Sequence, residues 1–477
     1  MDTFGTWIGR RAPRIEDERL LRGQGRFIDD IVLAGMLHAA FVRSPVAHGL
    51  VRAIDADTAR GMPGVYAVLT YADLRPLLKA ERIPQALPAG AIRFDVDPPC
   101  LVVEETCYVG EPIAVVIAVS RQLAEDAARA VDLDIEPLPA VLDPRDGLEP
   151  GAPKARLDCP DNLVARTGID YGDVEEAFAR AALVVKERFR LDKGGMHAME
   201  TRGIVAHFDR NEDLLTTWVN SQMPHRAKQI LVTALGLPEH QVRVKTPDVG
   251  GGFGPKATFH PEELAIPAAA MLLGTPVKWQ EDRYESFIAS SGERRQDWDM
   301  AMAVDREGLL LGLKGRLCHD HGAATPYGVA LPFNAASNVV GPYRLPAYKI
   351  GIDLCLTNMV PAVPTRGAGR PQGMYVMERL LDRVAAKLDI ARDEVRRRNL
   401  IPPGELPFTV PIVQRDGSAM VYDSGDYAEC QRRALEAIGW DGFEARRAAA
   451  QAEGRLIGIG LANYVEATGR GPFESAS

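Results

Sequence analysis

Closely spaced cysteines are missing from this sequence of 477 residues. It contains six cysteines, and no two of them form a C-x-x-C pair: Cys100, Cys107, Cys159, Cys318, Cys355 and Cys430. This spacing argues against a disulfide scaffold, a zinc knuckle and an iron–sulfur cluster held by this chain. We therefore expect a protein whose thiols are reduced.

A membrane-spanning run, a targeting pattern and a basic patch are also lacking. No apolar stretch is long enough to cross a bilayer, and the first residues do not combine a basic region with an apolar one. Acidic residues outnumber basic ones by 65 to 56, which gives a formal net charge of −9. This charge disfavours a nucleic-acid partner. We expect a cytoplasmic protein with no membrane span.

The chain does contain enough apolar material for several cores. Hydrophobic residues make up 46% and charged residues 25% of the sequence, and the length suits roughly two to four domains. The uninterrupted apolar run 113–119 predicts a buried strand. It is followed by an amphipathic helix at 123–131 and by a proline-rich linker near 137–153.

Alternation and capping signals predict further elements. We expect strands at 26–28, 36–42, 184–191 and 214–219, and a hairpin turn at 305–308. We expect helices at 226–235, ended by Gly236, from Pro261 to Gly274, and after Pro371. A last strand at 456–465 would either close an earlier sheet or open a domain that continues elsewhere.

A first glycine-rich loop, DVGGGFGPK, occupies residues 248–256. Its glycines let backbone N–H groups approach a ligand closely, because no Cβ intervenes. The P-loop pattern is not matched, since Pro255 and Ala257 stand where a glycine and a hydroxyl residue are required. The dinucleotide pattern G-x-G-x-x-G also fails at Pro255. A ligand-binding loop and a plain tight turn both remain open.

A second loop, RGAGRP, occupies residues 366–371 before the predicted long helix. Arg366, Arg370 and the free N–H groups of a helix start could hold an anionic group. The alternative is a helix-entry loop with solvated arginines.

Isolated polar residues carry weaker signals. Gln222, between a predicted strand and a helix, would ordinarily be a cap or a surface group, and Glu200 an ion-pair member or a polar strand end. His197 and His225 lack the spacing of a zinc site. No G-x-S-x-G motif supports acyl transfer.

Eight segments taken together are more specific than any one of them. In chain order they are GRFIDD (25–30), LHAAFVRSPVAHGLVRAID (37–55), YVGEPIAVVIA (108–118), AMETRG (198–203), DVGGGFGPK (248–256), PVKWQEDRYESF (276–287), RGAGRPQGMYVMER (366–379) and VRRRNLI (395–401). This set resembles the molybdenum-binding large chain of the xanthine dehydrogenase and aerobic carbon monoxide dehydrogenase family, and the resemblance covers nearly the whole chain.

The resemblance implies an α+β fold in which a hammerhead α/β domain precedes the first molybdopterin-binding domain. The implied division is an N-terminal arm at 1–20, the hammerhead domain at 21–142, a linker at 143–165, the first molybdopterin-binding domain at 166–435 and the truncated start of a second one at 436–477. The rest of that second domain, which carries the family's glutamate general base, is missing.

The resemblance also implies a cofactor site. The family's glutamine near the apical molybdenum ligand falls on Gln222, backbone amides of the first loop face the metal's ligands, and Arg366 lies on the cofactor side. No protein side chain is expected to bind the metal directly; Gln222, Phe253 and Arg366 would act around it. The implied cofactor-binding residues are Gln222, Gly251, Gly252, Phe253, Gly254, Arg366, Gly367 and Ala368.

The cofactor implied by the resemblance is molybdenum on molybdopterin, in the cytosine dinucleotide form. Iron–sulfur clusters and FAD would lie on other chains, namely an iron–sulfur small subunit and an FAD-binding medium subunit. A separate chain would supply the second molybdopterin domain and the catalytic base.

Three departures from the family's sequence pattern narrow the range of possible substrates. Carbon monoxide oxidisers carry a cysteine where Gly367 stands, and purine hydroxylases carry a glutamate where Ala257 stands. Thr365 replaces an aromatic residue found in many relatives. A less polar heteroaromatic compound or an aldehyde therefore fits better than a purine or carbon monoxide.

The sequence thus predicts a subunit of a molybdenum hydroxylase that oxidises a heteroaromatic or aldehyde carbon with oxygen derived from water. The alternative is a truncated, non-catalytic homologue that binds the cofactor or a partner. A free-standing phosphate binder is a third, weaker possibility.

Overall fold

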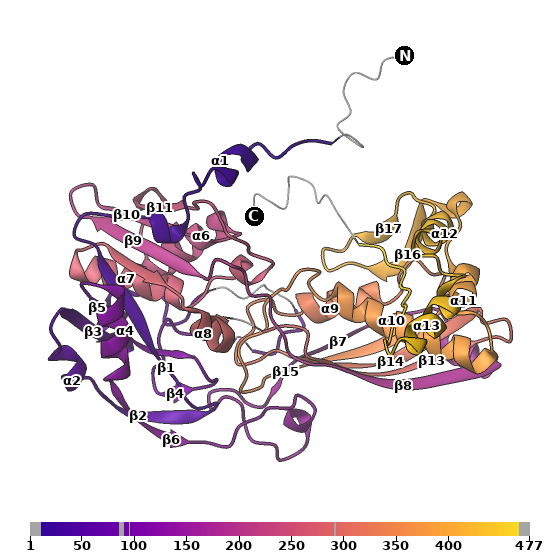
Figure 1. The fold of residues 1–477 in the computed structure, drawn as a ribbon. Coiled ribbons are helices and arrows are strands. Elements are labelled where there is room, and N and C mark those ends of the chain that lie inside the picture. Colours follow the sequence, from indigo (N-terminus) through magenta and orange to yellow (C-terminus); the bar gives the residue numbers. More distant parts are fainter. Residues whose placement is uncertain (1–10, 85–89, 95, 291, 467–477) are drawn as a thin grey trace.

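The computed structural model describes residues 11–84, 90–94, 96–290 and 292–466, and it has a mixed α+β architecture. Figure 1 shows two lobes side by side, each built on a β-sheet, with α10 and the later helices in the second lobe. The predicted α+β class is confirmed.

The first lobe is built on a seven-stranded sheet with the order β11-β10-β9-β12-β1-β5-β3. Its strands in chain order are β1 (Leu37–Arg43), β3 (Val65–Thr70), β5 (Pro112–Ala118), β9 (Gly203–Asp209), β10 (Leu214–Val219), β11 (Val242–Lys245) and β12 (Val277–Gln280). A small sheet, β4-β2-β6, lies beside it: β2 (Gly49–Asp55), β4 (Glu105–Thr106) and β6 (Asp132–Pro137). The helices of this lobe are α1 (Asp17–Leu21), α2 (Asp57–Arg60), α3 (Tyr71–Leu74), α4 (Arg121–Arg129), α6 (Pro224–Leu235), α7 (Glu262–Leu273) and α8 (Arg283–Glu285).

Segments from both predicted domains share this sheet. β1 pairs with β5 on one side and with β12, from much later in the chain, on the other. Leu37, Val115, Leu215 and Trp279 are buried in one common core. The domain boundaries stay predictions, but the two sequence regions are packed together through a continuous sheet.

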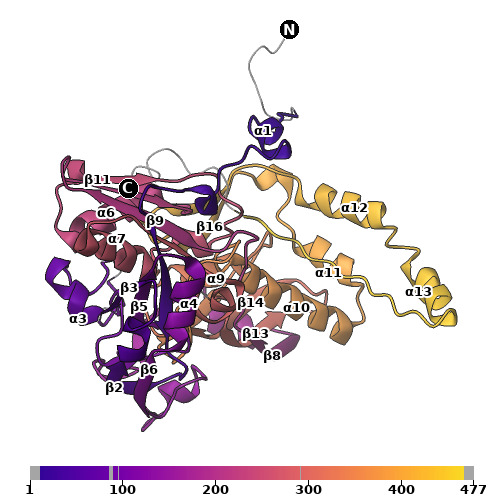
Figure 2. The same ribbon diagram turned by 60° about the vertical axis from the view of Figure 1, so that its left-hand side comes forward.

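The second lobe contains a five-stranded sheet with the order β7-β15-β14-β13-β8. Its strands are β7 (Leu163–Tyr171), β8 (Leu183–Leu191), β13 (Gln296–Val304), β14 (Leu310–Asp320) and β15 (Tyr348–Cys355), and a hairpin pairs β16 (Phe408–Val413) with β17 (Ala419–Tyr422). The helices are α5 (Val174–Ala179), α9 (Ala330–Asn338), α10 (Arg370–Leu388), α11 (Arg392–Asn399), α12 (Tyr427–Ile438) and α13 (Phe443–Ala452). Figure 2 shows α12 and α13 reaching away from both sheets.

Several predicted elements are present with the expected causes. All seven residues of β5 are buried, as an apolar run without a polar face requires. Gly236 and Gly274 end α6 and α7 in the left-handed conformation, with φ of +66° and +65°. Gly308, with φ of +80°, makes the turn of the predicted hairpin between β13 and β14.

The strand predicted at 26–28 is wrong, and the segment 456–465 closes no sheet among the described residues, so only its alternative, the opening of a further domain, stays a prediction. Residues 26–28 were expected to be extended, but a 3-10 helix begins at Ile28, because the Asp30 side chain accepts from the Phe27 N–H. Leu456–Val465 has no ladder partner among the described residues, and its apolar Leu456 is 89% exposed. An apolar sequence alone does not make a strand when no neighbouring edge receives its hydrogen bonds. The predicted boundary at 435 lies inside α12.

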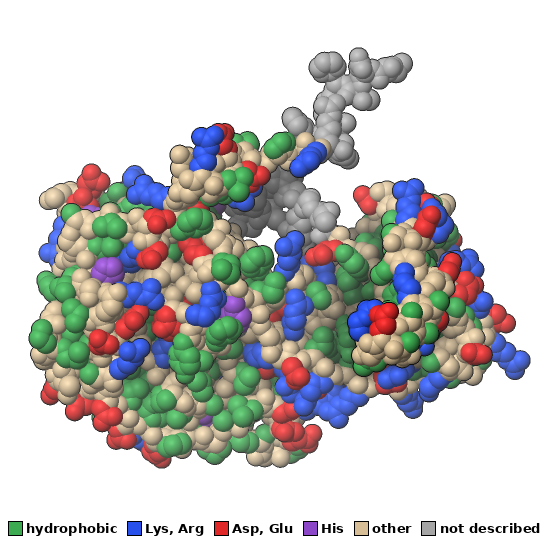
Figure 3. Space-filling view, in the orientation of Figure 1, with side chains coloured by type: hydrophobic (Ala, Val, Ile, Leu, Met, Phe, Trp, Pro, Cys, Tyr) green, Lys and Arg blue, Asp and Glu red, His purple; other side chains and the backbone are tan. Residues whose placement is uncertain are grey.

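The surface of the described chain agrees with the charge pattern of the sequence. On the face drawn in Figure 3, acidic and basic side chains are interspersed over most of the first lobe. Among the described helices, none has the length and apolar character that crossing a bilayer requires.

Candidate active site

The two glycine-rich loops, 248–256 and 366–370, lie against each other. The backbone N–H of Arg366 donates to the carbonyl oxygen of Phe253 over 2.8 Å. Gly254 has a φ of +112°, and a Cβ added to it would lie 2.1 Å from the carbonyl oxygen of Pro364. Only glycine tolerates both the dihedral angle and the close approach. The absence of a side chain at Gly254 therefore lets the two loops approach each other.

Backbone N–H groups around this contact are available to a ligand. Phe253 and Ala368 have positive φ values of 59° and 47°, a conformation that costs non-glycine residues of order 1 kcal/mol and concentrates at functional sites. The N–H groups of Gly252, Phe253 and Gly367 have no acceptor among the described residues. The loops thus offer at least three main-chain donors.

Gln222 lies between the end of β10 and the start of α6, and it contacts the first loop directly. Its Oε1 accepts from the N–H of Gly254 over 2.9 Å, and its own N–H donates to the carbonyl oxygen of Lys256 over 2.8 Å. A Cβ on Gly252 would lie 2.5 Å from Gln222 Oε1, so a glycine is required for the carboxamide to lie there. The Nε2 group, a donor, has no acceptor among the described residues and is available to a ligand.

These residues surround an open concavity of about 440 Å³. None of the residues that line it is acidic: Gln222, Phe253, Gly254, Ala257, Pro364, Thr365, Arg366, Gly367 and Ala368. The guanidinium of Arg366 is exposed and makes no ion pair within the part of the chain that the structure describes. Hydrogen-bond donors and one cation without a competing carboxylate suit an anionic ligand.

Two predicted site residues support the concavity without lining it. A Cβ on Gly251 would lie 2.8 Å from the Phe253 ring, and Gly252 lies against the Gln222 side chain.

The two histidines considered in the sequence lie apart from the concavity's lining. The ring of His197 packs on the ring of Phe287, with 4.5 Å between the ring centroids, and His225 is exposed. No group of three or more potential metal ligands occurs among the described residues.

Sequence reasoning did not foresee how the first loop is anchored. Lys256 is buried, and its Nζ donates to Glu200 Oε2 over 3.0 Å and to the Glu200 carbonyl oxygen over 2.9 Å. Glu200 Oε2 also accepts from the N–H of Gly250 over 2.7 Å. This pairing confirms Glu200 as an ion-pair member. A phosphate-binding loop would need a lysine that is free to bind phosphate, but Lys256 is paired with Glu200. The pairing therefore weighs against the phosphate-binder alternative.

A second buried cluster, missed in the sequence, lies behind Arg366. Arg294, with φ of +79°, donates from Nη2 to the Arg366 carbonyl oxygen over 3.0 Å. Its neighbour Glu293 is 1% exposed and accepts from Gln372 Nε2 over 3.2 Å. Burial raises the pKa of Glu293 to about 7. No motif marks these residues, because they act through a contact between segments distant in the sequence.

Buried charges join the site to the core of the first lobe. Arg202 binds Glu281 over 2.6 Å and Glu262 over 3.1 Å, and Arg43 binds Glu262 and Glu285, each over 2.8 Å. All five side chains are at most 16% exposed. The network connects β1, α7, α8 and the two chain segments next to β9 and β12.

A protonated carboxyl beside this network predicts that stability declines as the pH rises toward about 8. Burial raises the pKa of Glu263 to about 8, so the folded protein holds a proton that the unfolded chain releases near pH ~4.3. Stability conferred by this proton is fully present below pH ~4.3, declines as the pH rises from there, and is lost once the pH has passed through about 8. The variant Glu263→Gln should lose less stability than the wild type between pH ~6 and pH ~9, as measured by urea unfolding. The exposed-site control Glu212→Gln should follow the wild type, and an unchanged pH dependence in Glu263→Gln would contradict the assignment.

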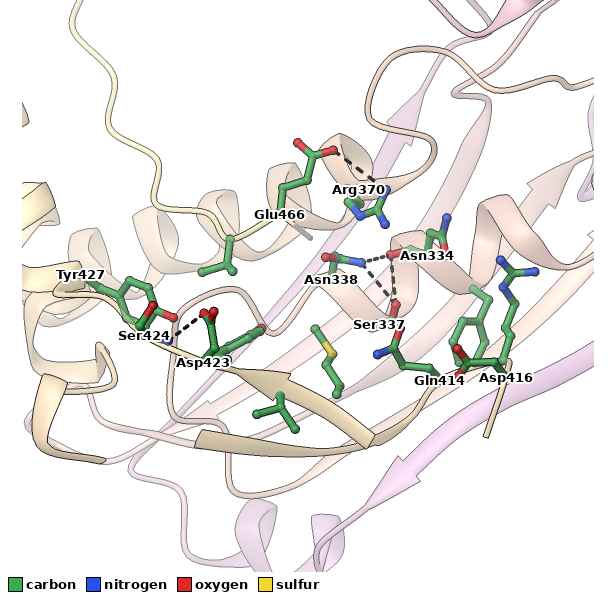
Figure 4. Close-up of a pocket in the computed structure, with 16 residues that line it drawn as sticks. Asn334, Ser337, Asn338, Arg370, Gln414, Asp416, Asp423, Ser424, Tyr427 and Glu466 are labelled. Atoms are coloured by element: carbon green, nitrogen blue, oxygen red, sulfur yellow. Dashed lines mark hydrogen bonds and ion pairs between the residues drawn. The ribbon is translucent and has the colours of Figure 1, made fainter. Parts of the chain in front are cut away.

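A larger concavity of about 720 Å³ lies on the other side of the second loop. Figure 4 shows it between α9, the start of α10 and the β16–β17 hairpin, with Glu466 facing Arg370. Asn334 Nδ2, on its wall, donates to the Ala368 carbonyl oxygen over 3.1 Å, so the two concavities share this loop. Its lining carries both signs of charge, Arg370 and Arg415 together with Asp416, Asp423 and Glu466, so it lacks the acid-free lining of the smaller concavity.

Two segments of the chain match known protein families. Residues 156–400, just over half of the chain, match the molybdopterin cofactor-binding domain. The chain belongs to this molybdopterin-binding family. Residues 22–139 match the a/b hammerhead domain of aldehyde oxidase and xanthine dehydrogenase. The family expected from the ordered motifs is confirmed.

Individual relatives agree with this assignment over most of the chain. The nicotine 6-hydroxylase large subunit of Paenarthrobacter nicotinovorans is 38% identical over 97% of this chain and 56% of its own length. Quinoline 2-oxidoreductase from Pseudomonas putida 86 superimposes with a TM-score of 0.86 at 35% identity, over 94% of this chain and 56% of that one. The chain thus spans little more than half of these relatives. The nicotinate dehydrogenase large molybdopterin subunit of Eubacterium barkeri is 28% identical over 91% of this chain, which is 98% of that subunit.

The residues at the smaller concavity fit the family's cofactor. Its phosphate, dithiolene and oxo groups are acceptors or anions, and the concavity presents amides, a carboxamide and a guanidinium with no acidic side chain. The close approach of Gly252 and Gly254 to their neighbours keeps this cradle open. That Phe253, Gln222 and Arg366 hold the cofactor stays a prediction.

Proposed function

We propose that this chain is one subunit of a molybdenum hydroxylase that oxidises a heteroaromatic or aldehyde carbon with oxygen derived from water. The observation that carries the proposal is the acid-free, donor-rich concavity where Gln222 meets both loops. The bound cofactor would supply the oxidation chemistry. This chain would bind one side of it and orient it through Gln222, Phe253 and Arg366.

The wall of the concavity supports a weakly polar substrate. Ala257 and Thr365 line it beside Phe253, whose side chain is 39% exposed. Neither an acidic group nor a thiol stands at the positions of Ala257 and Gly367. An aromatic heterocycle or an aldehyde would contact this surface without leaving buried polar groups unpaired.

We further propose that the catalytic base lies on a separate chain. The concavity holds no carboxylate that could accept a proton. The relative from Eubacterium barkeri, matched over 98% of its length, is itself called a large molybdopterin subunit, which supports an arrangement in several chains. Iron–sulfur clusters and FAD would be held by further subunits, and the cytosine dinucleotide form of the cofactor is part of the same proposal.

Removing the Gln222 carboxamide should lower turnover more than cofactor content. In Gln222→Ala, loss of an oriented donor should reduce turnover by about 100-fold, while the main-chain amides still retain the cofactor. Molybdenum and cytidine nucleotide are measured in protein co-expressed with its neighbouring reading frames, and turnover is measured on heteroaromatic and aldehyde substrates.

The matched control for this variant is Gln229→Ala, an exposed glutamine on α6. It should keep wild-type turnover and cofactor content. Unchanged turnover of Gln222→Ala at full molybdenum occupancy would refute the role of Gln222. A stable chain that never contains molybdenum and co-purifies with no other chain would favour the non-catalytic alternative.

A further inference from the structure

The N-terminal segment that precedes the first sheet contacts the glycine loop 248–256. Arg19, on the short helix α1, binds the carboxylate of Asp248 through both terminal nitrogens, each over 2.5 Å. Figure 1 places α1 above the lobe that contains β10 and β11, from which the loop emerges. Asp248 is the first residue of the loop, and 229 positions separate it from Arg19.

Asp248 is also held by main-chain contacts from the same segment. Its Oδ2 accepts from the N–H of Arg26 over 2.8 Å, and its own N–H donates to the Arg26 carbonyl oxygen over 3.0 Å. The hydrogen bond from Arg19 lowers the pKa of Asp248 to about 2. The carboxylate is therefore ionised and able to pair with Arg19 throughout the neutral pH range.

The segment reaches the middle of the loop through Glu200. The N–H of Ile28 donates to Glu200 Oε1 over 3.3 Å, and Oε2 of the same carboxylate accepts from Gly250 and Lys256. Lys256 is in turn bound to the N–H of Gln222 through its carbonyl oxygen. Hydrogen bonds and ion pairs thus run without a gap from residues 19–28 to Gln222 at the concavity.

We propose that residues 19–28, and Arg19 in particular, position the glycine loop for ligand binding. A loop with four glycines in five positions has little conformational preference of its own. Its order must come from anchors at its ends, and Asp248 is the anchor at the N-terminal end. Arg19 and Asp248 are positioning residues, since neither lines the concavity. The role of the loop in binding a ligand rests on the proposed function, whereas the experiment below does not depend on that function.

A double-mutant cycle on the cofactor-free 477-residue chain tests this inference. The readout is millisecond hydrogen–deuterium exchange of the two hydrogen-bonded loop amides, Gly250 and Gly254, which donate to Glu200 and Gln222, compared with peptides from β13 and β14. Arg19→Ala should speed exchange in the loop by about threefold to tenfold and leave the reference peptides unchanged. Asp248→Asn should have a similar effect, and the double variant should exceed neither single variant by much, because both remove the same contact.

A charge-swapped pair and a neighbouring arginine give the controls. Arg19→Asp combined with Asp248→Arg should restore part of the slow exchange, which a general loss of stability would not do. Arg22→Ala removes an exposed pair with Glu18 on the same helix and should leave the loop unchanged. If Asp248→Asn does not fold, Arg19→Ala and Arg19→Lys still decide the question, because Arg19 is 41% exposed.

Loop exchange that is unchanged in Arg19→Ala, or that rises equally in the reference peptides, would overturn the inference. The cofactor is absent from this experiment, so its outcome is independent of the proposed function. As a second readout, molybdenum loss on dialysis of the co-expressed protein should be about threefold to tenfold faster in Arg19→Ala than in Arg22→Ala. Faster exchange without any bound molybdenum in the wild type would refute the proposed function while leaving the positioning role intact.

Discussion

Replacing Gly254 with alanine should lower the molybdenum content of the co-expressed protein at least about tenfold. The new Cβ would lie 2.1 Å from the Pro364 carbonyl oxygen, at a φ of +112° that alanine rarely adopts. Overpacking costs about 1–3 kcal/mol and the strained dihedral angle adds about 1–2 kcal/mol, so the loops should move apart. The Arg366 N–H would then leave the Phe253 carbonyl oxygen, and the concavity would lose its shape. Molybdenum per chain is measured by mass spectrometry of the metal.

The matched control is Gly351→Ala on β15, where an added Cβ meets no atom within 4 Å. This variant should keep both its molybdenum and its far-UV circular dichroism spectrum. Gly254→Ala should also keep its spectrum, because the collision is confined to two loops. Full molybdenum occupancy in Gly254→Ala would show that contact between the loops is not needed for binding.

Removing the charge of Arg202 should destabilise the first lobe by about 3–5 kcal/mol, the cost of leaving buried carboxylates without their partner. The Arg202 side chain is 4% exposed and pairs with Glu262 and Glu281. Burial alone would raise the pKa of Glu262, but the charges of Arg202 and Arg43 lower it to about 2. Arg202→Met keeps much of the volume and removes the charge. Urea unfolding followed by circular dichroism measures the change in the free energy of unfolding.

Two further variants separate this effect from a general one. Arg188→Met, at a side chain that is 61% exposed, should change stability by less than about 0.5 kcal/mol. Adding Glu281→Gln to Arg202→Met should recover part of the loss, because the ion pair of Glu281 is made with Arg202 and its unpaired charge is then gone. A loss in Arg202→Met no larger than that in Arg188→Met would mean that the network contributes little.

The elements that sequence predicted well are those whose cause is local. β5 follows from an unbroken apolar run, and the ends of α6 and α7 follow from Gly236 and Gly274. The segment 456–465 pairs with no described strand, since a strand depends on a partner edge that local sequence does not specify, and its alternative role as the start of a further domain stays a prediction. The joint sheet could not be predicted either, because its central pairing of β1 with β12 links distant segments.

The site divides in the same way. Ordered motifs indicated Gln222, the first loop and Arg366, and the structure brings them to one concavity. Their roles toward a cofactor stay predictions. The anchors that hold the loops, Arg19 and Arg294, lie in no motif and act through contacts that only the fold creates. The sequence therefore indicated the residues that line the concavity better than the residues that hold the two loops in position.

The most direct test of the central claim is the density at the smaller concavity in a structure of the chain co-purified with its partner. The account predicts a molybdenum cofactor within hydrogen-bond distance of the Phe253 N–H and Gln222 Nε2, with its other side contacted by the second chain. A cofactor bound in the larger concavity beside Asn338, or a concavity closed by protein side chains, would contradict it.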